Sequence, residues 1–268
     1  MSVSRRGFLA AAAGVVLGAC AAGRRRTTAA RPTSTSAPSA SATSAASPST
    51  AAATRGTPSV SPAGGPAELI VAGPRTASAV ALTFHGSGEL RLTDALLAEA
   101  RRLDVPITVF AVGRWLDENP GVAARLAAAG HAVANHTYTH PALGQVGRAT
   151  VAQEITGCRD VLVRQLGNNG RWFRPSGIDR ATPLMLEEAG AAGYAQVVGF
   201  DVDPHDYADP GAAAVAQRVA DGIRPGSIVS LHLGHSGTVE AFDRMVTAIR
   251  ARGLSPVLLG ELLGGAGR

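Results

Sequence analysis

Two histidines four residues apart are the first candidates for chemistry, in the stretch His136-Thr137-Tyr138-Thr139-His140. If this turn is helical, side chains at positions i and i+4 leave from one face, about 5–6 Å apart at Cβ. Neutral imidazole is the commonest nitrogen ligand of divalent metals, so the spacing suits two ligands of one ion. An isolated pair of this kind is more often two polar loop residues. The metal interpretation gains support here because other His, Arg and Asp residues recur at the ends of predicted strands.

Seven short apolar runs alternate with helical patterns after residue 66. Strand signals separated by helices indicate parallel βαβ units, so this region is expected to form one α/β domain with a sizeable core. Periodicity alone leaves open whether the strands form a closed barrel or an open doubly wound sheet. The predicted strands are 79–84, 107–112, 131–134, 171–174, 195–202, 227–233 and 256–259.

Three of the intervening helices are predicted from their apolar faces and end signals. One is capped by Thr93 and runs to Arg102, and a second carries one apolar stripe over 151–166. A third carries Val239, Phe242, Val246 and Ile249 on one face. Glycines stand where helices should stop, namely at Gly130, Gly167, Gly193 and Gly253.

Polar side chains gather where these predicted strands end. In both candidate architectures, chemistry takes place at the C-terminal ends of parallel strands. The sequence therefore predicts one site from residues that are far apart along the chain. They are His85, His136, Arg174, Ser176, Asp203, Asp206 and His232.

Five motifs that contain these residues resemble, in type and order, those of the NodB-type polysaccharide deacetylases, carbohydrate esterase family 4. The resemblance covers roughly residues 78–260 and implies an irregular, incomplete (β/α)7 barrel. It also implies a divalent metal ion, most commonly Zn²⁺, and removal of acetyl groups from N-acetylglucosamine-containing cell-wall or extracellular polysaccharide. The motifs are Thr83-Phe84-His85-Gly86-Ser87-Gly88, His136-Thr137-Tyr138-Thr139-His140, Phe173-Arg174-Pro175-Ser176-Gly177, Asp203-Pro204-His205-Asp206-Tyr207 and Ser230-Leu231-His232.

The resemblance implies roles for the catalytic residues. His136 and His140 would be metal ligands. Arg174 resembles the arginine that orients the catalytic carboxylate, and Asp206 would brace Arg174 through a charge-assisted pair. His232 would be the general acid that protonates the leaving amine.

Further roles that the resemblance implies concern substrate contacts. Ser176 and Tyr207 are expected to bind substrate, with Tyr207 standing where the family has Trp. Leu231 would wall the pocket for the acetyl methyl group, and Thr137 would support the histidine loop.

The first motif departs from the family's T-F-D-D-G. His85 stands in place of the catalytic base and Gly86 in place of the third metal ligand. His85 is either the base, since its ordinary pKa of about 6.5 suits neutral pH, or a third histidine ligand brought in by backbone freedom at Gly86. A third possibility is a glycan-binding lipoprotein on the same fold that no longer turns substrate over.

An α/β-hydrolase esterase is the rival enzyme class. Gly234-His235-Ser236-Gly237-Thr238 nearly matches the G-x-S-x-G nucleophile elbow but fails at its last position. That fold also needs its catalytic His after the Ser, whereas all seven histidines precede Ser236.

The N-terminus indicates export and a membrane anchor. Residues 1–20 resemble a twin-arginine-like lipoprotein signal, with Arg5-Arg6, a short apolar run and a lipobox-like stretch, 17–20, that ends at Cys20. Residues 21–66 are rich in Ser, Thr, Ala and Pro and predict a disordered linker, which leaves 67–268 as the deacetylase domain. We expect a lipid anchor at Cys20 on the outer face of the cytoplasmic membrane, or otherwise secretion.

The net charge of the chain differs between the segment before residue 67 and the predicted domain. All 25 basic residues are arginines, and seven of them precede residue 67, where no acidic residue occurs. The remaining 18 arginines are balanced by 20 acidic residues, so the folded domain is slightly acidic and nucleic acid is not an expected partner. We expect a monomer without an intrachain disulfide, and a surface position for His131 at the start of its strand.

Overall fold

The computed structural model describes residues 64–264. The predicted signal, Cys20 and nearly all of the linker lie outside these residues. Within 64–264, no helix is long and apolar enough to cross a membrane.

Every strand pair within 64–264 is parallel, as the alternating pattern predicts. Strands β4 (Ala132–Asn135), β3 (Thr108–Ala111), β2 (Ala79–Gly86) and β6 (Ile228–His232) lie side by side in that order. Strand β7 (Ser255–Val257) pairs with the first residues of β2. A separate pair joins β1 (Glu68–Ile70) to β5 (Gln196–Val198), and the sequence patterns did not predict β1.

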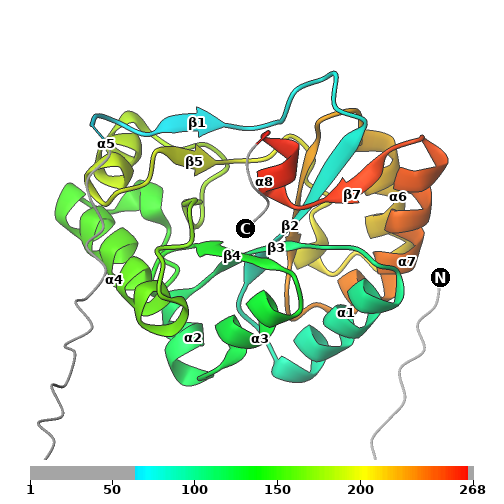
Figure 1. The fold of residues 1–268 in the computed structure, drawn as a ribbon, viewed down its shortest axis with the longest axis horizontal. Helices are drawn as coiled ribbons and strands as arrows, with labels where there is room; N and C mark the ends of the chain where they lie inside the picture. Colours follow the sequence, from blue (N-terminus) through cyan, green and yellow to red (C-terminus); the bar gives the residue numbers. More distant parts are fainter. Residues whose placement is uncertain (1–63, 265–268) are drawn as a thin grey trace, which may run out of the picture. The chain divides into compact units, whose positions relative to one another are not determined.

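Isolated bridges connect the two sheets into an irregular barrel. Phe173 bridges Asn135 at the end of β4 and Val197 in β5, and Val202 then bridges Val229 in β6. The path of strands therefore returns to its start with interruptions, and the expected irregular (β/α) barrel is confirmed (Figure 1). The runs predicted as strands at 171–174 and 195–202 are shorter than expected, because only single residues pair at Phe173 and Val202.

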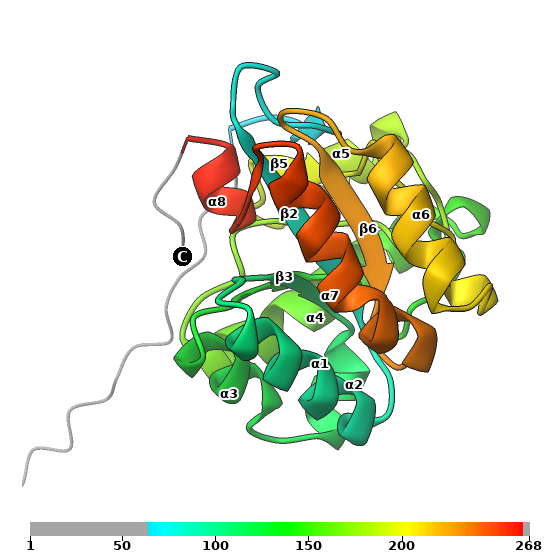
Figure 2. The same ribbon diagram turned by 90° about the vertical axis from the view of Figure 1, so that its right-hand side faces the viewer.

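Helices surround these strands, with α6 and α7 packed side by side outside β6 (Figure 2). Their bounds are α1 Leu90–Arg102, α2 Gly113–Glu118, α3 Val122–Ala128, α4 Arg148–Leu166, α5 Pro183–Ala191, α6 Ala212–Gly222, α7 Ser236–Ala251 and α8 Leu259–Leu262, with 3₁₀ turns η1 Leu143–Gln145 and η2 Asp206–Ala208.

Strand alternation decides which side chains face the site. In β2, Val80, Leu82 and Phe84 belong to the large core cluster beneath the helices, whereas Ala81 belongs to the cluster inside the barrel. Because successive side chains of a strand point to opposite faces, Thr83 and His85 share the interior face with Ala81. The interior face of β2 therefore ends in a histidine.

The predicted helix ends are largely confirmed, with one exception. Gly167 ends α4 in the left-handed conformation at φ 75°, and the stripe from Val151 to Leu162 is buried. The exception is α1, which begins after Glu89 rather than at a Thr93 cap. Thr93 is buried within the helix, and its hydroxyl donates to the Glu89 carbonyl at 3.3 Å.

The expectation that His131 is a surface residue is wrong. Its side chain is buried at the start of β4, where Nδ1 accepts a hydrogen bond from the Ile107 backbone N–H at 3.3 Å. Burial, and then the charge of Arg101, lower its pKa. His131 thus joins the start of β4 to the chain entering β3 and lies apart from the candidate site.

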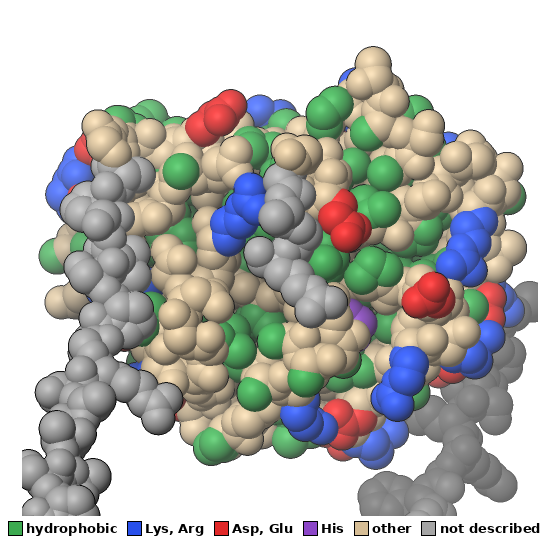
Figure 3. Space-filling view, in the orientation of Figure 1, with side chains coloured by type: hydrophobic (Ala, Val, Ile, Leu, Met, Phe, Trp, Pro, Cys, Tyr) green, Lys and Arg blue, Asp and Glu red, His purple; other side chains and the backbone are tan. Residues whose placement is uncertain are grey.

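Arginine and acidic side chains are mixed on the face drawn in Figure 3 rather than gathered by sign. Arginines of the described domain form ion pairs with neighbouring carboxylates, for example Arg125 with Asp94 at 3.1 Å and Arg75 with Asp201 at 2.8 Å. The distribution fits the near balance of charge in the sequence of the domain.

Candidate metal and catalytic site

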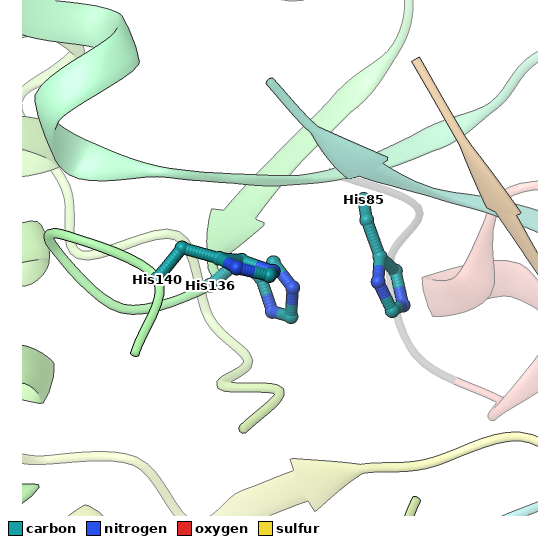
Figure 4. A group of neighbouring side chains, drawn as sticks. All are labelled: His85, His136 and His140. Carbon is teal, nitrogen blue, oxygen red and sulfur yellow. The ribbon is translucent and has the colours of Figure 1, made fainter. Parts of the chain in front are cut away.

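Three histidines converge at the C-terminal ends of β2 and β4, which lie on either side of β3. His85 lies at the end of β2, and His136 and His140 lie in the loop that follows β4. Their rings turn toward one common space (Figure 4), and one nitrogen from each lies within 4.8 Å of the other two. The structure thus brings together the histidines that the strand-end pattern predicted.

The loop with the two histidines is not helical, so the geometric premise of the i, i+4 spacing is wrong. Thr137 and His140 have φ values of 69° and 63°, in the left-handed region that side chains rarely adopt. The loop folds back on itself, and the two imidazole centroids still lie 4.9 Å apart. Such backbone strain needs support from the surrounding structure.

Glu154 supplies part of that support, although the sequence patterns gave no role to it. From α4 its carboxylate accepts the backbone N–H groups of Tyr138 at 2.8 Å and Thr139 at 2.7 Å, and the Thr139 hydroxyl at 2.6 Å. The sequence does contain a signal for this role, since Glu154 lies inside the apolar stripe of a predicted helix. A carboxylate buried there needs several hydrogen-bond donors from nearby segments.

Ser176 also supports this loop, which corrects its expected role in substrate binding. It is fully buried, accepts from the Thr137 hydroxyl at 3.1 Å and donates to the Pro141 carbonyl at 2.6 Å. The His136 carbonyl also lies within hydrogen-bonding distance of Thr137 Oγ1, so the single hydrogen of this hydroxyl is shared between the carbonyl and Ser176. Thr137 therefore supports the loop as expected, and Ser176 shares that task because no substrate can reach it.

Hydrogen bonding fixes the proton on His136. Its Nδ1 lies 2.9 Å from the Arg174 carbonyl, which can only accept, so Nδ1 carries the hydrogen. The other nitrogen, Nε2, keeps a lone pair, yet it is buried and has no hydrogen-bond partner within residues 64–264. A buried unpaired acceptor is costly unless something occupies it, and this pattern is typical of a histidine that binds a metal.

The electrostatic environment keeps all three rings neutral. Burial lowers the pKa of His85 and of His136 well below the usual value, and the neighbouring rings lower both further. Burial also lowers the pKa of His140. Because a metal ligand must be deprotonated, these neutral imidazoles fit a divalent ion, and three nitrogen ligands are typical of a catalytic zinc site.

A histidine–aspartate pair lies beside this cluster. The His232 ring centroid is 4.3 Å from that of His85, and its Nδ1 is 2.7 Å from the Asp206 carboxylate. Asp206 also accepts the His232 backbone N–H at 2.8 Å and the Thr238 hydroxyl at 2.7 Å. Burial raises the pKa of Asp206, but these hydrogen bonds outweigh burial and lower it overall. The pair engages Nδ1 of His232, and no described residue bonds to its Nε2.

Comparison with known proteins identifies the family. A polysaccharide deacetylase model matches residues 72–197. The chitooligosaccharide deacetylase of Sinorhizobium fredii is 32% identical over 199 residues, which cover 66% of this chain and 88% of that protein. This chain belongs to the polysaccharide deacetylase family.

Solved deacetylase structures share the fold. The peptidoglycan N-acetylglucosamine deacetylase Bc1960 superposes with a TM-score of 0.70 and 27% identity, covering 75% of this chain and 94% of that chain. BA3943 of Bacillus anthracis, a pseudoenzyme of carbohydrate esterase family 4, superposes with a TM-score of 0.68 and 28% identity, covering 73% and 69%. The fold is therefore shared by a named deacetylase and by a named pseudoenzyme.

Membership of the deacetylase family removes the α/β-hydrolase alternative. Ser236 begins α7, and the preceding His235 bonds through Nδ1 to the Asp209 carboxylate at 2.9 Å. His205, the other histidine with no role from sequence, bonds through Nδ1 to the Tyr207 hydroxyl at 2.8 Å.

The expected pair between Arg174 and Asp206 is wrong. The Arg174 guanidinium donates to the carbonyls of Val198 at 2.9 Å and Gly199 at 3.0 Å and to the Thr83 hydroxyl at 2.9 Å. It also lies over the Phe110 ring at 4.0 Å. The resemblance implies a carboxylate at the position of His85, and in this structure two carbonyls and a hydroxyl satisfy the buried cation.

Leu231 is also misplaced by sequence reasoning. It is fully buried in the cluster beneath the helices, in register with Phe84, and so points away from the site. Ser230 is the residue of β6 that shares the interior face with His232. Tyr207, by contrast, is 49% exposed and its ring centroid lies 5.2 Å from that of His232, a position open to substrate.

Gly86 is a close-packed strand residue rather than a hinge. It pairs with Ala111 in β3, and a Cβ built on it would lie 2.7 Å from Val109 Cγ1 and 2.9 Å from the Ala111 Cα. The second carboxylate of the deacetylase motif therefore has no room here unless β3 moves. Of the two positions where the first motif has carboxylates, 85 and 86, only position 85 therefore offers a side chain to the site.

Gly86→Ala is expected to lower the free energy of unfolding by about 1–3 kcal/mol, the usual cost of overpacking. Chemical denaturation monitored by circular dichroism measures this change. Gly237→Ala is the matched control, because the nearest atom to its added Cβ is 3.6 Å away, an ordinary contact. Equal stability of the Gly86→Ala variant and the parent would refute the close packing.

Proposed function

We propose that this chain is a metal-dependent hydrolase that removes acetyl groups from N-acetylglucosamine-containing cell-wall or extracellular polysaccharide. The observation that carries the proposal is the convergence of three neutral histidines beside a histidine held by a buried aspartate. A surface that only binds glycan needs neither the unpaired Nε2 of His136 nor the His232–Asp206 pair.

His85, His136 and His140 would hold the ion, and Zn²⁺ suits three imidazole ligands best. When bound, Zn²⁺ supplies a Lewis acid for the acetyl carbonyl and makes water more acidic. His85 serves as a ligand in this proposal rather than as the base. Its ring is packed between those of His136 and His232, with centroids 4.4 Å and 4.3 Å away, and burial favours its neutral form.

His232 is the proton-exchanging residue of the proposed site. Asp206 engages Nδ1, so Nε2 is the nitrogen that faces the reacting groups. The carboxylate also stabilises the imidazolium that forms when the ring holds an extra proton, in the manner of other catalytic Asp–His pairs. His232 can therefore deliver a proton to the leaving amine, which is a poor leaving group without one.

Tyr207 is the proposed substrate contact at the edge of the site. Its exposed ring offers an apolar face to a sugar, while the hydroxyl stays bonded to His205 at 2.8 Å. The relatives are chitooligosaccharide and peptidoglycan N-acetylglucosamine deacetylases, which places acetylated polysaccharide first among the substrates to test.

The test is acetate release by the zinc-loaded full chain from chitooligosaccharides and from peptidoglycan fragments. Appearance of a free amine with each acetate would assign N-deacetylation, whereas acetate without amine would assign O-deacetylation. No acetate from any acetylated glycan, with the metal bound, would refute the proposal.

A catalytically impaired glycan-binding lipoprotein is the second candidate. Loss of both carboxylates of the first motif favours it, and BA3943, a pseudoenzyme, has a similar structure. This alternative predicts that the zinc-loaded chain binds N-acetylglucosamine oligomers in calorimetry and releases no acetate from them.

We also propose export and anchoring through Cys20, which lies outside the described residues. The support is the twin-arginine stretch and the lipobox-like sequence that ends at Cys20. Bacterial lipoproteins carry more than one acyl chain, and two or more chains give stable membrane binding.

Cys20→Ala is therefore expected to move the protein from the membrane fraction to the soluble fraction of the producing bacterium. Immunoblotting of the two fractions measures the shift, with Cys158→Ala as a control for loss of a thiol elsewhere in the chain. Equal retention of the Cys20→Ala variant and the parent in the membrane fraction would refute the anchor.

A further inference from the structure

Ser230 is placed to act on His85. It lies in β6 with its side chain buried on the interior face, in register with Thr83 of the neighbouring strand. Its Oγ is 3.3 Å from His85 Nε2, while its backbone N–H donates to the Val202 carbonyl at 2.9 Å. The hydroxyl is therefore the part of Ser230 that faces the histidine cluster.

A metal-binding histidine needs its second nitrogen held by a hydrogen bond, because that bond fixes the tautomer and the ring orientation. His136 has such a bond from Nδ1 to the Arg174 carbonyl. The corresponding bond of His85 is made by Nε2, and among the described residues no hydrogen-bond partner of Nδ1 is found. The two rings thus make this bond with different nitrogens. His136 bonds to a carbonyl through Nδ1, and His85 bonds to a hydroxyl through Nε2.

We propose that Ser230 is a positioning residue that accepts the Nε2–H of His85 and so presents Nδ1 to the divalent ion. The inference rests on the metal site of the proposed function and deepens it. This chain combines a histidine at position 85 with a hydroxyl that can orient it.

The hydroxyl can also donate, and the two arrangements predict opposite tautomers. If Ser230 donates to Nε2, the hydrogen of His85 sits on Nδ1, and that nitrogen cannot bind an ion. Nitrogen-15 NMR of the metal-free full chain distinguishes them. The Nε2–H tautomer is the expected result, and a dominant Nδ1–H tautomer would overturn the proposal without any variant having to fold.

Zinc affinity of the full chain, measured by competition with a chromophoric chelator, gives the second test. Ser230→Ala should weaken zinc binding about 10–100-fold, the usual effect of removing such a supporting bond. Ser230→Thr keeps the hydroxyl and should restore affinity. Ser227→Ala removes a buried hydroxyl just before the same strand, where Oγ bonds to Asp201 at 3.2 Å, and should leave affinity unchanged.

A third test introduces Ser230→Ala into the His85→Ala variant, to distinguish positioning of His85 from a general loss of structure. In that variant Ser230→Ala should cause no further loss of zinc affinity, because the imidazole that Ser230 positions is absent. An equal loss in both backgrounds, or unchanged affinity of Ser230→Ala alone, would overturn the proposal. These measurements use zinc without glycan, so a protein that binds zinc normally but releases no acetate would refute the deacetylase function and leave this inference standing.

Discussion

Replacing His136 and His140 together by alanine is expected to abolish zinc uptake and, with it, acetate release. The two residues supply two of the three converging nitrogens, and His136 Nε2 is buried without another partner in the described part of the chain. One remaining imidazole cannot hold the ion, because catalytic zinc sites use three protein ligands. Elemental analysis of the purified variant after equilibration with zinc measures the loss.

The matched control is His205→Ala with His235→Ala, which removes two histidines outside the converging set. Both are bonded to neighbours in the loops, to Tyr207 and to Asp209. This control should still bind one zinc ion per chain. Unchanged zinc stoichiometry in the His136/His140 variant would contradict the assignment.

His232→Ala is expected to lower kcat about 10²–10⁴-fold while one zinc ion remains bound. The range is typical for loss of a positioned acid or base. Zinc content should not change, since His232 engages Asp206 and lies outside the three converging histidines. Initial rates of acetate release at saturating chitooligosaccharide, together with zinc analysis of the same sample, measure both quantities.

The Asp206→Asn variant tests the carboxylate that holds His232. An amide at this position keeps the shape but not the negative charge, so Nδ1 of His232 loses its ionic partner. We expect a large fall in kcat with normal zinc content. A fully active His232→Ala protein would remove His232 from the reaction, whatever the result for Asp206→Asn.

Much of the site could be predicted because parallel strands bring their C-terminal ends together. The apolar runs located β2, β4 and β6, and the residues at their ends include His85, His136 and His232. Spacing alone could not predict the shape of the histidine loop. The loop has left-handed residues at Thr137 and His140, and it is held by hydrogen bonds that it donates to Glu154 and accepts from Ser176, which are distant in sequence.

The wrong predictions have physical causes: they misjudge which face of a strand a side chain occupies, or which groups a side chain contacts. Leu231 is adjacent to His232, and a shift of one residue along a strand changes the face. The resemblance implies a pair between Asp206 and Arg174, yet the Asp206 carboxylate bonds to His232 and Thr238. Gly86 was predicted to be flexible because glycine permits many conformations, whereas here the absence of Cβ permits close contact with β3.

We propose that His85 takes over from the missing carboxylates of the first motif as a ligand of the ion. X-ray absorption spectroscopy of the zinc-loaded full chain at the zinc edge tests it directly. We predict three imidazole nitrogens at about 2.0–2.1 Å from zinc in the parent and two in His85→Ala. Two imidazoles in the parent, or the same number in both proteins, would contradict the claim.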